Sequence, residues 1–73
     1  MLEKIKNQLI SFLEANYNEF SNLEDSETCI LNNDELSDEV IEYLKQNYRF
    51  DYKGLCIYWV EDEGEIWVEN MVA

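Results

Sequence analysis

Carboxylates dominate the side chains of this chain that could do chemistry. Of its 73 residues, 17 are Asp or Glu, 5 are Lys or Arg and 0 are His, which gives a formal net charge of -12. Without His, the commonest proton-transfer group is absent, and neither cysteine has a His with which to form a thiolate pair. A catalytic carboxylate pair needs one acid in an apolar pocket, whereas these acids follow solvated patterns. We therefore expect no enzyme activity, no catalytic residue and no cofactor.

Oxygen ligands gather in one stretch of the chain, where a metal ion could bind. They do not follow the spacing of the helix-loop-helix calcium motif, which needs a sharp-turn Gly between its ligands and a closing Glu. We expect weak binding of divalent cations there and no dedicated metal site. The residues in this stretch are Asn32, Asn33, Asp34, Glu35, Asp38 and Glu39.

The distribution of the carboxylates is more informative than their number. No basic residue lies between Lys6 and Lys45, and every charged residue after Lys53 is acidic. Carboxylates four apart on a helix are separated by about 6 Å along the axis, and alternate strand residues by about 6.6 Å, so such rows can imitate a phosphate backbone. An ordinary solvated face is the alternative for any one row. The candidate partner-binding acids are Glu35, Asp38, Glu39 and Glu42 in one stretch and Glu61, Asp62, Glu63, Glu65 and Glu69 in the other.

The first part of the chain is predicted to form an amphipathic helix and a short strand. Apolar residues recur with three-and-four spacing from Leu2 to about Asn18, which indicates the helix. The apolar run from Cys29 to Leu31 fits an edge strand.

A second helix is predicted to carry the first group of acids. Its two candidate starts lie near Asn33 and at Ser37. Ser37 is the better N-cap, because Asp38 and Glu39 would follow it and complement the positive end of the helix dipole. Tyr48 is expected at the end of the buried stripe of this helix.

A C-terminal β-hairpin is predicted to carry the second group of acids. Phe50 and Tyr52 alternate with charged residues, and strands follow at 55–60 and 65–69 with Gly64 in the turn between them. Only an even loop length keeps the apolar residues on one face of the sheet. A four-residue loop would pair Trp59 with Ile66, and a two-residue loop would keep the same faces.

With that register, three large side chains point outward from the hairpin. Tyr58, Val60 and Trp67 would lie among Glu65 and Glu69, and exposed aromatic rings ringed by acids resemble an interface hot spot. The alternative is a sheet buried on both faces, with Trp67 under the loop at 18–34. Tyr58 and Trp67 join the acids as candidate partner-binding residues, and whether they form a homodimer interface stays open.

The predicted fold is α+β, with two helices packed on one face of a small antiparallel sheet that contains the C-terminal hairpin. A single domain spans residues 1–73, and its 47% hydrophobic and 14% aromatic content supports folding despite the charge. No apolar run is long enough for a signal peptide or a membrane span, so we expect a cytoplasmic protein. In that compartment Cys29 and Cys56 are expected to be reduced.

This combination of size, charge layout and missing catalytic groups resembles the small acidic phage-type anti-defence inhibitors, which include anti-CRISPR and anti-restriction DNA mimics. The resemblance lies in composition and charge layout, and no family residue is carried over. It implies a cytoplasmic inhibitor in the host bacterium that occupies the nucleic-acid channel of a basic partner, a defence nuclease or CRISPR effector. Phosphates and anionic lipids repel an acidic surface, so we expect no direct binding of nucleic acid or membrane.

Two other classes of protein fit the same residues. An immunity or antitoxin-like protein would neutralise a basic toxin with the same electrostatics. A small adaptor would bind through the exposed aromatic sheet face around Tyr58 and Trp67, and its binding would depend less on salt.

Overall fold

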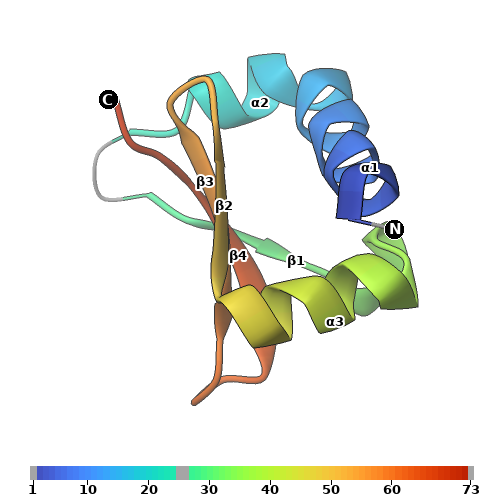
Figure 1. The fold of residues 1–73 in the computed structure, drawn as a ribbon. Helices are drawn as coiled ribbons and strands as arrows, with labels where there is room; N and C mark the ends of the chain where they lie inside the picture. The colour runs from blue at the N-terminus through green and yellow to red at the C-terminus, as the bar shows by residue number, and fades with distance from the viewer. Residues whose placement is uncertain (1, 25–26, 73) are drawn as a thin grey trace.

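Helices cover one face of a four-stranded antiparallel sheet (Figure 1). The computed structural model describes residues 2–24 and 27–72. The strand order is β1-β4-β3-β2, so the last strand in the sequence lies between the first and the third. The elements are α1 (Leu2–Ala15), α2 (Tyr17–Ser21), β1 (Cys29–Leu31), the 3-10 helix η1 (Asn33–Glu35), α3 (Asp38–Asn47), β2 (Arg49–Tyr52), β3 (Leu55–Val60) and β4 (Glu65–Asn70). The predicted α+β fold with a C-terminal hairpin is confirmed.

The first predicted helix is two helices, separated at Asn16. This residue has φ -114 and ψ 15, outside the helical region, and its side-chain amide donates to the Phe12 carbonyl at 2.9 Å. The chain then resumes as α2 and buries Phe20 to 2% exposure, with its ring centroid 5.9 Å from that of Phe12. The predicted end near Asn18 was therefore wrong, because α1 ends at Ala15 and position 18 lies inside α2, which ends at Ser21.

The second helix begins after Ser37, as predicted. The Ser37 hydroxyl accepts a hydrogen bond from the Val40 amide at 3.4 Å and donates to the Gln8 side chain of α1 at 2.7 Å. The other candidate start corresponds to η1, where the Asn32 amide donates to the Glu35 carboxylate at 2.8 Å. Both starts therefore have helical structure, but only the Ser37 cap begins an α-helix.

The hairpin loop has an even number of residues, as predicted, and its register is the one expected for a four-residue loop. Trp59 lies opposite Ile66 across a four-residue loop that ends at Gly64, which has φ 64. The alternating run around Phe50 and Tyr52 is strand β2, which pairs with β3 and forms one edge of the sheet. The predicted edge strand β1 forms the other edge and pairs with β4.

The hydrophobic core lies between the helices and the inner face of the sheet. All three α-helices contribute side chains to it, and so do β1, β3 and β4. The buried members are Leu9, Leu13, Phe20, Leu31, Val40, Leu44, Leu55, Ile57, Ile66 and Val68. Within residues 2–24 and 27–72, no helix has both the length and the apolar character needed to cross a bilayer.

The two cysteines lie on opposite faces of the sheet. Cys29 is paired in register with Val68 on the inner face, whereas Cys56 is paired with Glu69 on the outer face, and β4 runs between the two cysteine strands. Both thiols are free. A disulfide between them would have to cross the sheet, so the two thiols cannot pair with each other in this fold.

Candidate partner-binding surface

The acids predicted on the second helix are exposed, but lysines accompany two of them. The Glu39 carboxylate lies 4.0 Å from the Lys4 ammonium of α1, and the Glu42 carboxylate lies 3.7 Å from that of Lys45. Such exposed pairs contribute only about 0–1 kcal/mol to stability, but each cation offsets part of the negative field that a partner would meet. The helix row is therefore less negative than the sequence of α3 suggests.

The remaining two acids of this row serve the local backbone. Glu35 closes η1 through its hydrogen bond from the Asn32 amide, and Asp38 lies in the first turn of α3, where a negative charge complements the helix dipole. Both side chains are exposed. Glu35 and Asp38 thus stabilise the local backbone, one by a hydrogen bond within η1 and the other by its place at the start of α3.

The acids of the β3–β4 turn have a different environment. Glu61, Asp62 and Glu63 are all exposed, and in the described part of the chain none of the three lies within an ion-pair distance of a cation. The Gly64 amide closes the turn by donating to the Val60 carbonyl at 2.8 Å. In Figure 1 this turn projects beyond the end of α3, away from α1 and α2. It is the most concentrated group of uncompensated carboxylates among the predicted site residues.

The outer sheet face, which we define by the outward side chains of Ile30, Arg49, Cys56, Tyr58, Glu65, Trp67 and Glu69, brings four predicted residues together. The rings of Tyr58 and Trp67 meet edge to face with centroids 6.2 Å apart. The Tyr58 hydroxyl donates to Glu69 at 2.8 Å, and the Trp67 indole nitrogen donates to Glu65 at 3.2 Å. Each aromatic side chain is thus held in place by a carboxylate.

The environment of Tyr58 perturbs its titration. Burial and the hydrogen bond to Glu69 together raise the pKa of Tyr58 to about 12. The phenol therefore remains a neutral hydrogen-bond donor throughout the physiological pH range. Trp67 is half-buried beside the exposed Ile30, so the face lies between the two predicted alternatives of full exposure and full burial.

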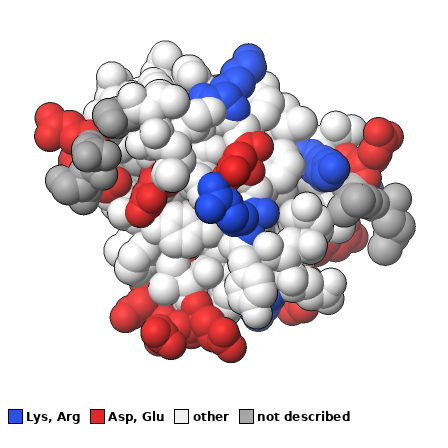
Figure 2. Space-filling view, turned by 60° about the vertical axis from the view of Figure 1, so that its left-hand side comes forward, with Lys and Arg blue, Asp and Glu red and all other residues white. Residues whose placement is uncertain are grey.

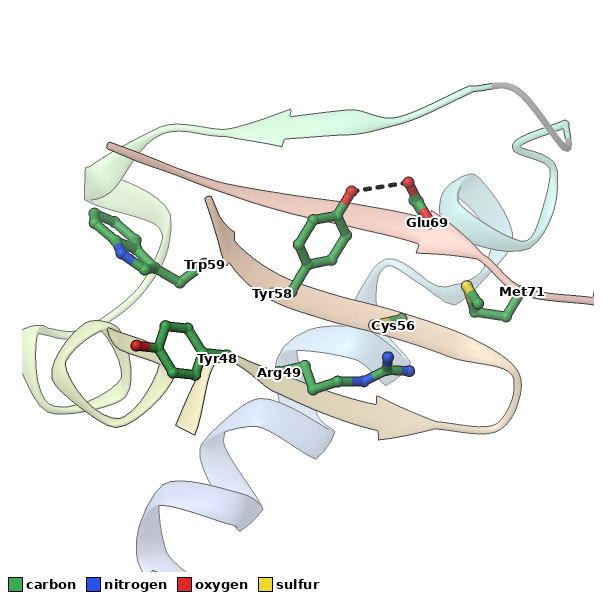
Figure 3. Close-up of a pocket in the computed structure, with 7 residues that line it drawn as sticks. All are labelled: Tyr48, Arg49, Cys56, Tyr58, Trp59, Glu69 and Met71. Atoms are coloured by element: carbon green, nitrogen blue, oxygen red, sulfur yellow. Dashed lines mark hydrogen bonds between the residues drawn. The ribbon is translucent and has the colours of Figure 1, made fainter. Parts of the chain in front are cut away.

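Sequence reasoning missed a pocket on the outer side of the sheet. It measures about 250 Å³ and its lining includes Tyr48 and Met71, which are 58% and 56% exposed. Figure 3 shows Tyr48 and Trp59 at one end of the pocket, Glu69 and Met71 at the other, and Tyr58 between them. The lining residues are Tyr48, Arg49, Cys56, Tyr58, Trp59, Glu69 and Met71.

Tyr48 lines this pocket because the helix ends one residue earlier than its apolar stripe suggests. The residue has φ 71, so the chain turns sharply between α3 and β2, and the ring leaves the helix face. Its predicted place in the buried stripe was therefore wrong. Left-handed conformations at the end of a helix are usually predicted from a Gly, and position 48 is a Tyr, so the sequence does not indicate this turn.

Two cations of the second half of the chain, Arg49 and Lys53, lie in or next to the edge strand β2, and the third, Lys45, lies in α3. Arg49 binds both carboxylate oxygens of Asp51, at 2.8 and 2.9 Å, and the Lys53 ammonium lies 2.9 Å from Glu14 of α1. Lys45 lies 5.1 Å from the centroid of the Trp59 ring. Charged side chains on an edge strand discourage pairing with another chain. Each of these three cations thus contacts a side chain of the same molecule, and Arg49 also discourages another chain from pairing with the edge of the sheet.

Figure 2 shows how these charges divide the surface. Basic side chains lie mainly across the middle and upper parts of the view, with acidic side chains between them and at both sides. The largest acidic group lies at the lower end, where Figure 1 places the β3–β4 turn. The densest negative charge in this view therefore lies at the end of the sheet formed by that turn.

The surface offers little for covalent or metal chemistry. Burial raises the pKa of the Cys56 thiol to about 12, with a further contribution from Asp51, so this sulfur stays protonated and weakly nucleophilic at neutral pH. Within the described residues, no three Cys, Asp or Glu side chains converge as a metal site would require.

No family model, no curated protein and no solved structure matches this chain.

Proposed function

We propose that this protein is a non-enzymatic acidic inhibitor that binds a basic nucleic-acid-binding surface of a defence nuclease complex and blocks access of nucleic acid, as anti-CRISPR DNA mimics do. The observation that carries the proposal is the β3–β4 turn, where Glu61, Asp62 and Glu63 are exposed and lack cationic partners in the described part of the chain. The net charge of -12 adds a long-range attraction toward any basic surface.

The electrostatics favour competition with nucleic acid over direct binding of it. A surface built for phosphates presents Lys and Arg, and carboxylates spaced along a turn and strand can meet the same side chains. At physiological salt the Debye length is about 8 Å, so only groups close to the interface contribute strongly. The closely spaced acids of the turn therefore count for more than acids scattered over the helices. The host cytoplasm is the expected compartment.

Nucleic-acid competition tests the proposal directly. We would capture partners from a bacterial lysate at low salt, identify them by mass spectrometry, and titrate the complex with duplex DNA and with RNA. We expect a basic nucleic-acid-binding protein that either nucleic acid displaces, with affinity that falls steeply between about 50 and 200 mM salt. Binding that is insensitive to both nucleic acid and salt would contradict the proposal.

A matched pair of double variants tests which acids contribute to binding of the captured partner. Glu61→Gln/Glu63→Gln and Glu39→Gln/Glu42→Gln each remove two negative charges, but the second pair already has lysine neighbours. We expect the turn variant to weaken binding to the captured partner by about tenfold or more, and the helix variant to weaken it less. Equal losses would mean that net charge alone acts and that the turn is not a specific contact.

The half-buried aromatic pair on the outer sheet face favours a second candidate, an adaptor that binds through Tyr58 and Trp67. Such a protein would bind its partner with little dependence on salt and would not compete with nucleic acid. A captured basic toxin, in contrast, would identify the chain as an immunity or antitoxin-like protein.

A further inference from the structure

We infer that the basic partner contacts the outer sheet face together with the β3–β4 turn, and that it presents apolar side chains surrounded by Lys or Arg. The basic character of this partner rests on the proposed function. The position of the contact and its apolar centre are new, and they follow from four features of the face.

The first feature is a continuous row of side chains across all four strands. Ile30 of β1 is in register with Trp67 of β4, Trp67 with Tyr58 of β3, and Tyr58 with Arg49 of β2. Residues directly opposite each other in a sheet share a face. Three of the four side chains in this row are large and apolar or aromatic, so the row crosses the sheet as one stripe.

The second feature is apolar exposure at the ends of the stripe and along the pocket. Ile30 is 54% exposed at one edge, and Tyr48, which precedes Arg49 of β2, is 58% exposed near the other. Met71, 56% exposed, follows β4 and lines the opposite end of the pocket from Tyr48. These three account for most of the large exposed hydrophobic side chains in the described part of the chain. Exposed apolar side chains gathered on one face, with polar residues around them, mark interaction sites.

The third feature is the pair of carboxylates that flanks the stripe. Glu65 and Glu69 lie two residues before and after Trp67 on β4, so they are on the same face of the sheet. Their hydrogen bonds from Trp67 and Tyr58 hold them beside the rings. An apolar centre with a charged rim is the usual arrangement of a protein interface, and this rim is acidic.

The fourth feature is the net charge of this face, which indicates whether a second copy of the chain, a nucleic acid or a basic protein could bind there. The cations near the row already have acidic partners, Arg49 in Asp51, Lys53 in Glu14 and Lys45 in Glu42. The turn next to Glu65, in contrast, adds three more carboxylates. A second copy of the chain would bring two net charges of -12 together. Nucleic acid would meet the same repulsion. A basic protein with apolar side chains at the centre of its contact surface is the occupant that fits.

Trp67 fluorescence provides a direct test. In a Trp59→Phe variant, Trp67 is the sole tryptophan, and two synthetic peptides with equal numbers of arginines serve as probes, one alternating Arg with Leu and one alternating Arg with Gly. We expect the leucine peptide to bind about tenfold more tightly, to shift the Trp67 emission to shorter wavelength and to protect it from acrylamide quenching. Equal affinities, no binding of either peptide, or an unshielded Trp67 would overturn the inference.

Chemical-shift mapping on the unmodified protein makes the test independent of the tryptophan substitution. On addition of the leucine peptide, we expect the largest amide shifts at Ile30, Tyr58 and Trp67 and in the β3–β4 turn. Shifts centred on α3 would overturn the inference, and so would a concentration-dependent dimer that buries this face.

A matched pair of lysine variants separates the position of the contact from the effect of charge. Ile30→Lys places a cation at the exposed end of the stripe, and Ser11→Lys makes the same change of one charge on the exposed surface of α1. We expect Ile30→Lys to weaken binding of the leucine peptide about tenfold or more and Ser11→Lys to weaken it much less. Equal effects would overturn the inference.

The same variants distinguish this inference from the proposed function when applied to the protein captured from the lysate. If Ile30→Lys abolishes binding but nucleic acid does not compete, the contact face is supported and the nucleic-acid mimic is rejected. If nucleic acid competes but Ile30→Lys and Ser11→Lys bind alike, the mimic is supported and the contact face is rejected.

Discussion

Tyr58 is the residue at which the chemistry of the outer sheet face is easiest to measure. Its hydroxyl donates to Glu69, and burial and this bond raise the pKa of Tyr58 to about 12. The ordinary pKa of a tyrosine is about 10, so the folded state favours the protonated phenol. The protonated phenol therefore stabilises the folded state. This stabilisation is complete below the pKa of Tyr58 in the unfolded chain and is lost as pH rises through its pKa in the folded protein.

Comparison of the Tyr58→Phe variant with the unmodified protein should isolate this titration. In the difference between their absorbance titrations, we expect the tyrosinate signal of Tyr58 to emerge near pH 12 and not near pH 10. The variant should lose about 0.5–1.5 kcal/mol of unfolding free energy at neutral pH, because Glu69 loses a hydrogen bond. A difference titration centred near pH 10 would contradict the Tyr58–Glu69 contact.

At the scale of elements, Ser37 connects the start of α3 with α1. Its hydroxyl caps the helix at Val40 and also donates to Gln8. We expect Ser37→Ala to lower the unfolding free energy by about 1 kcal/mol, measured by urea denaturation. Ser11→Ala, at an exposed position inside α1, is the control and should have little effect. Equal effects of the two changes would mean that the cap is not formed.

The two glycines of the sheet turns provide a second comparison at this scale. Gly64 has φ +64 and no atom within 4 Å of the position of an added Cβ, whereas Gly54 has φ +81 and Val72 Cγ1 lies 2.8 Å from that position. Gly64→Ala should therefore cost about 1–2 kcal/mol from backbone strain alone. Gly54→Ala should cost more, because Val72 must move as well. Thermal melts of the two variants would measure this difference. A lower melting temperature for Gly64→Ala than for Gly54→Ala would contradict the expectation.

The elements also show where sequence reasoning succeeds and where it stops. The Ser37 cap and the hairpin register follow from neighbouring residues and from strand alternation, so both could be predicted. The break at Asn16 could not, because it depends on how Phe20 reaches a core built by distant segments. The contact between Lys4 and Glu39 joins two helices, and the spacing along either helix does not reveal it. For the same reason, the helix row of acids looked more negative in the sequence than it is in the structure.

For the whole molecule, self-repulsion among the carboxylates should limit stability. The net charge is -12, and few of the acids have cationic neighbours in the described residues. We expect added salt to raise the melting temperature, measured by circular dichroism, because screening weakens repulsion between exposed charges. A melting temperature that does not change with salt would mean that the carboxylates are too dispersed to repel one another.

Mild acidification should also raise the melting temperature, but only over a limited range of pH. Partial protonation of exposed acids reduces the repulsion. Hydrogen bonds from Tyr52 and Lys53 lower the pKa of Glu14, and hydrogen bonds from Arg49 lower the pKa of Asp51. A lowered carboxyl pKa gives stability that is present above the unfolded pKa and is lost as pH falls through the folded value. The melting temperature should therefore rise on mild acidification and fall at lower pH, and a decrease from the outset would contradict this expectation.

The strand order has a consequence for how the molecule assembles. β4 is the last strand in the sequence, yet it lies between β1 and β3. β1 pairs with β4, and the contact between Cys29 and Val68 closes a loop that contains α3, β2 and β3. Local contacts form faster than distant ones, because a longer loop costs more entropy to close. The hairpin should thus form early and dock β1 last, so Ile30 joins the outer face only in the final step of folding.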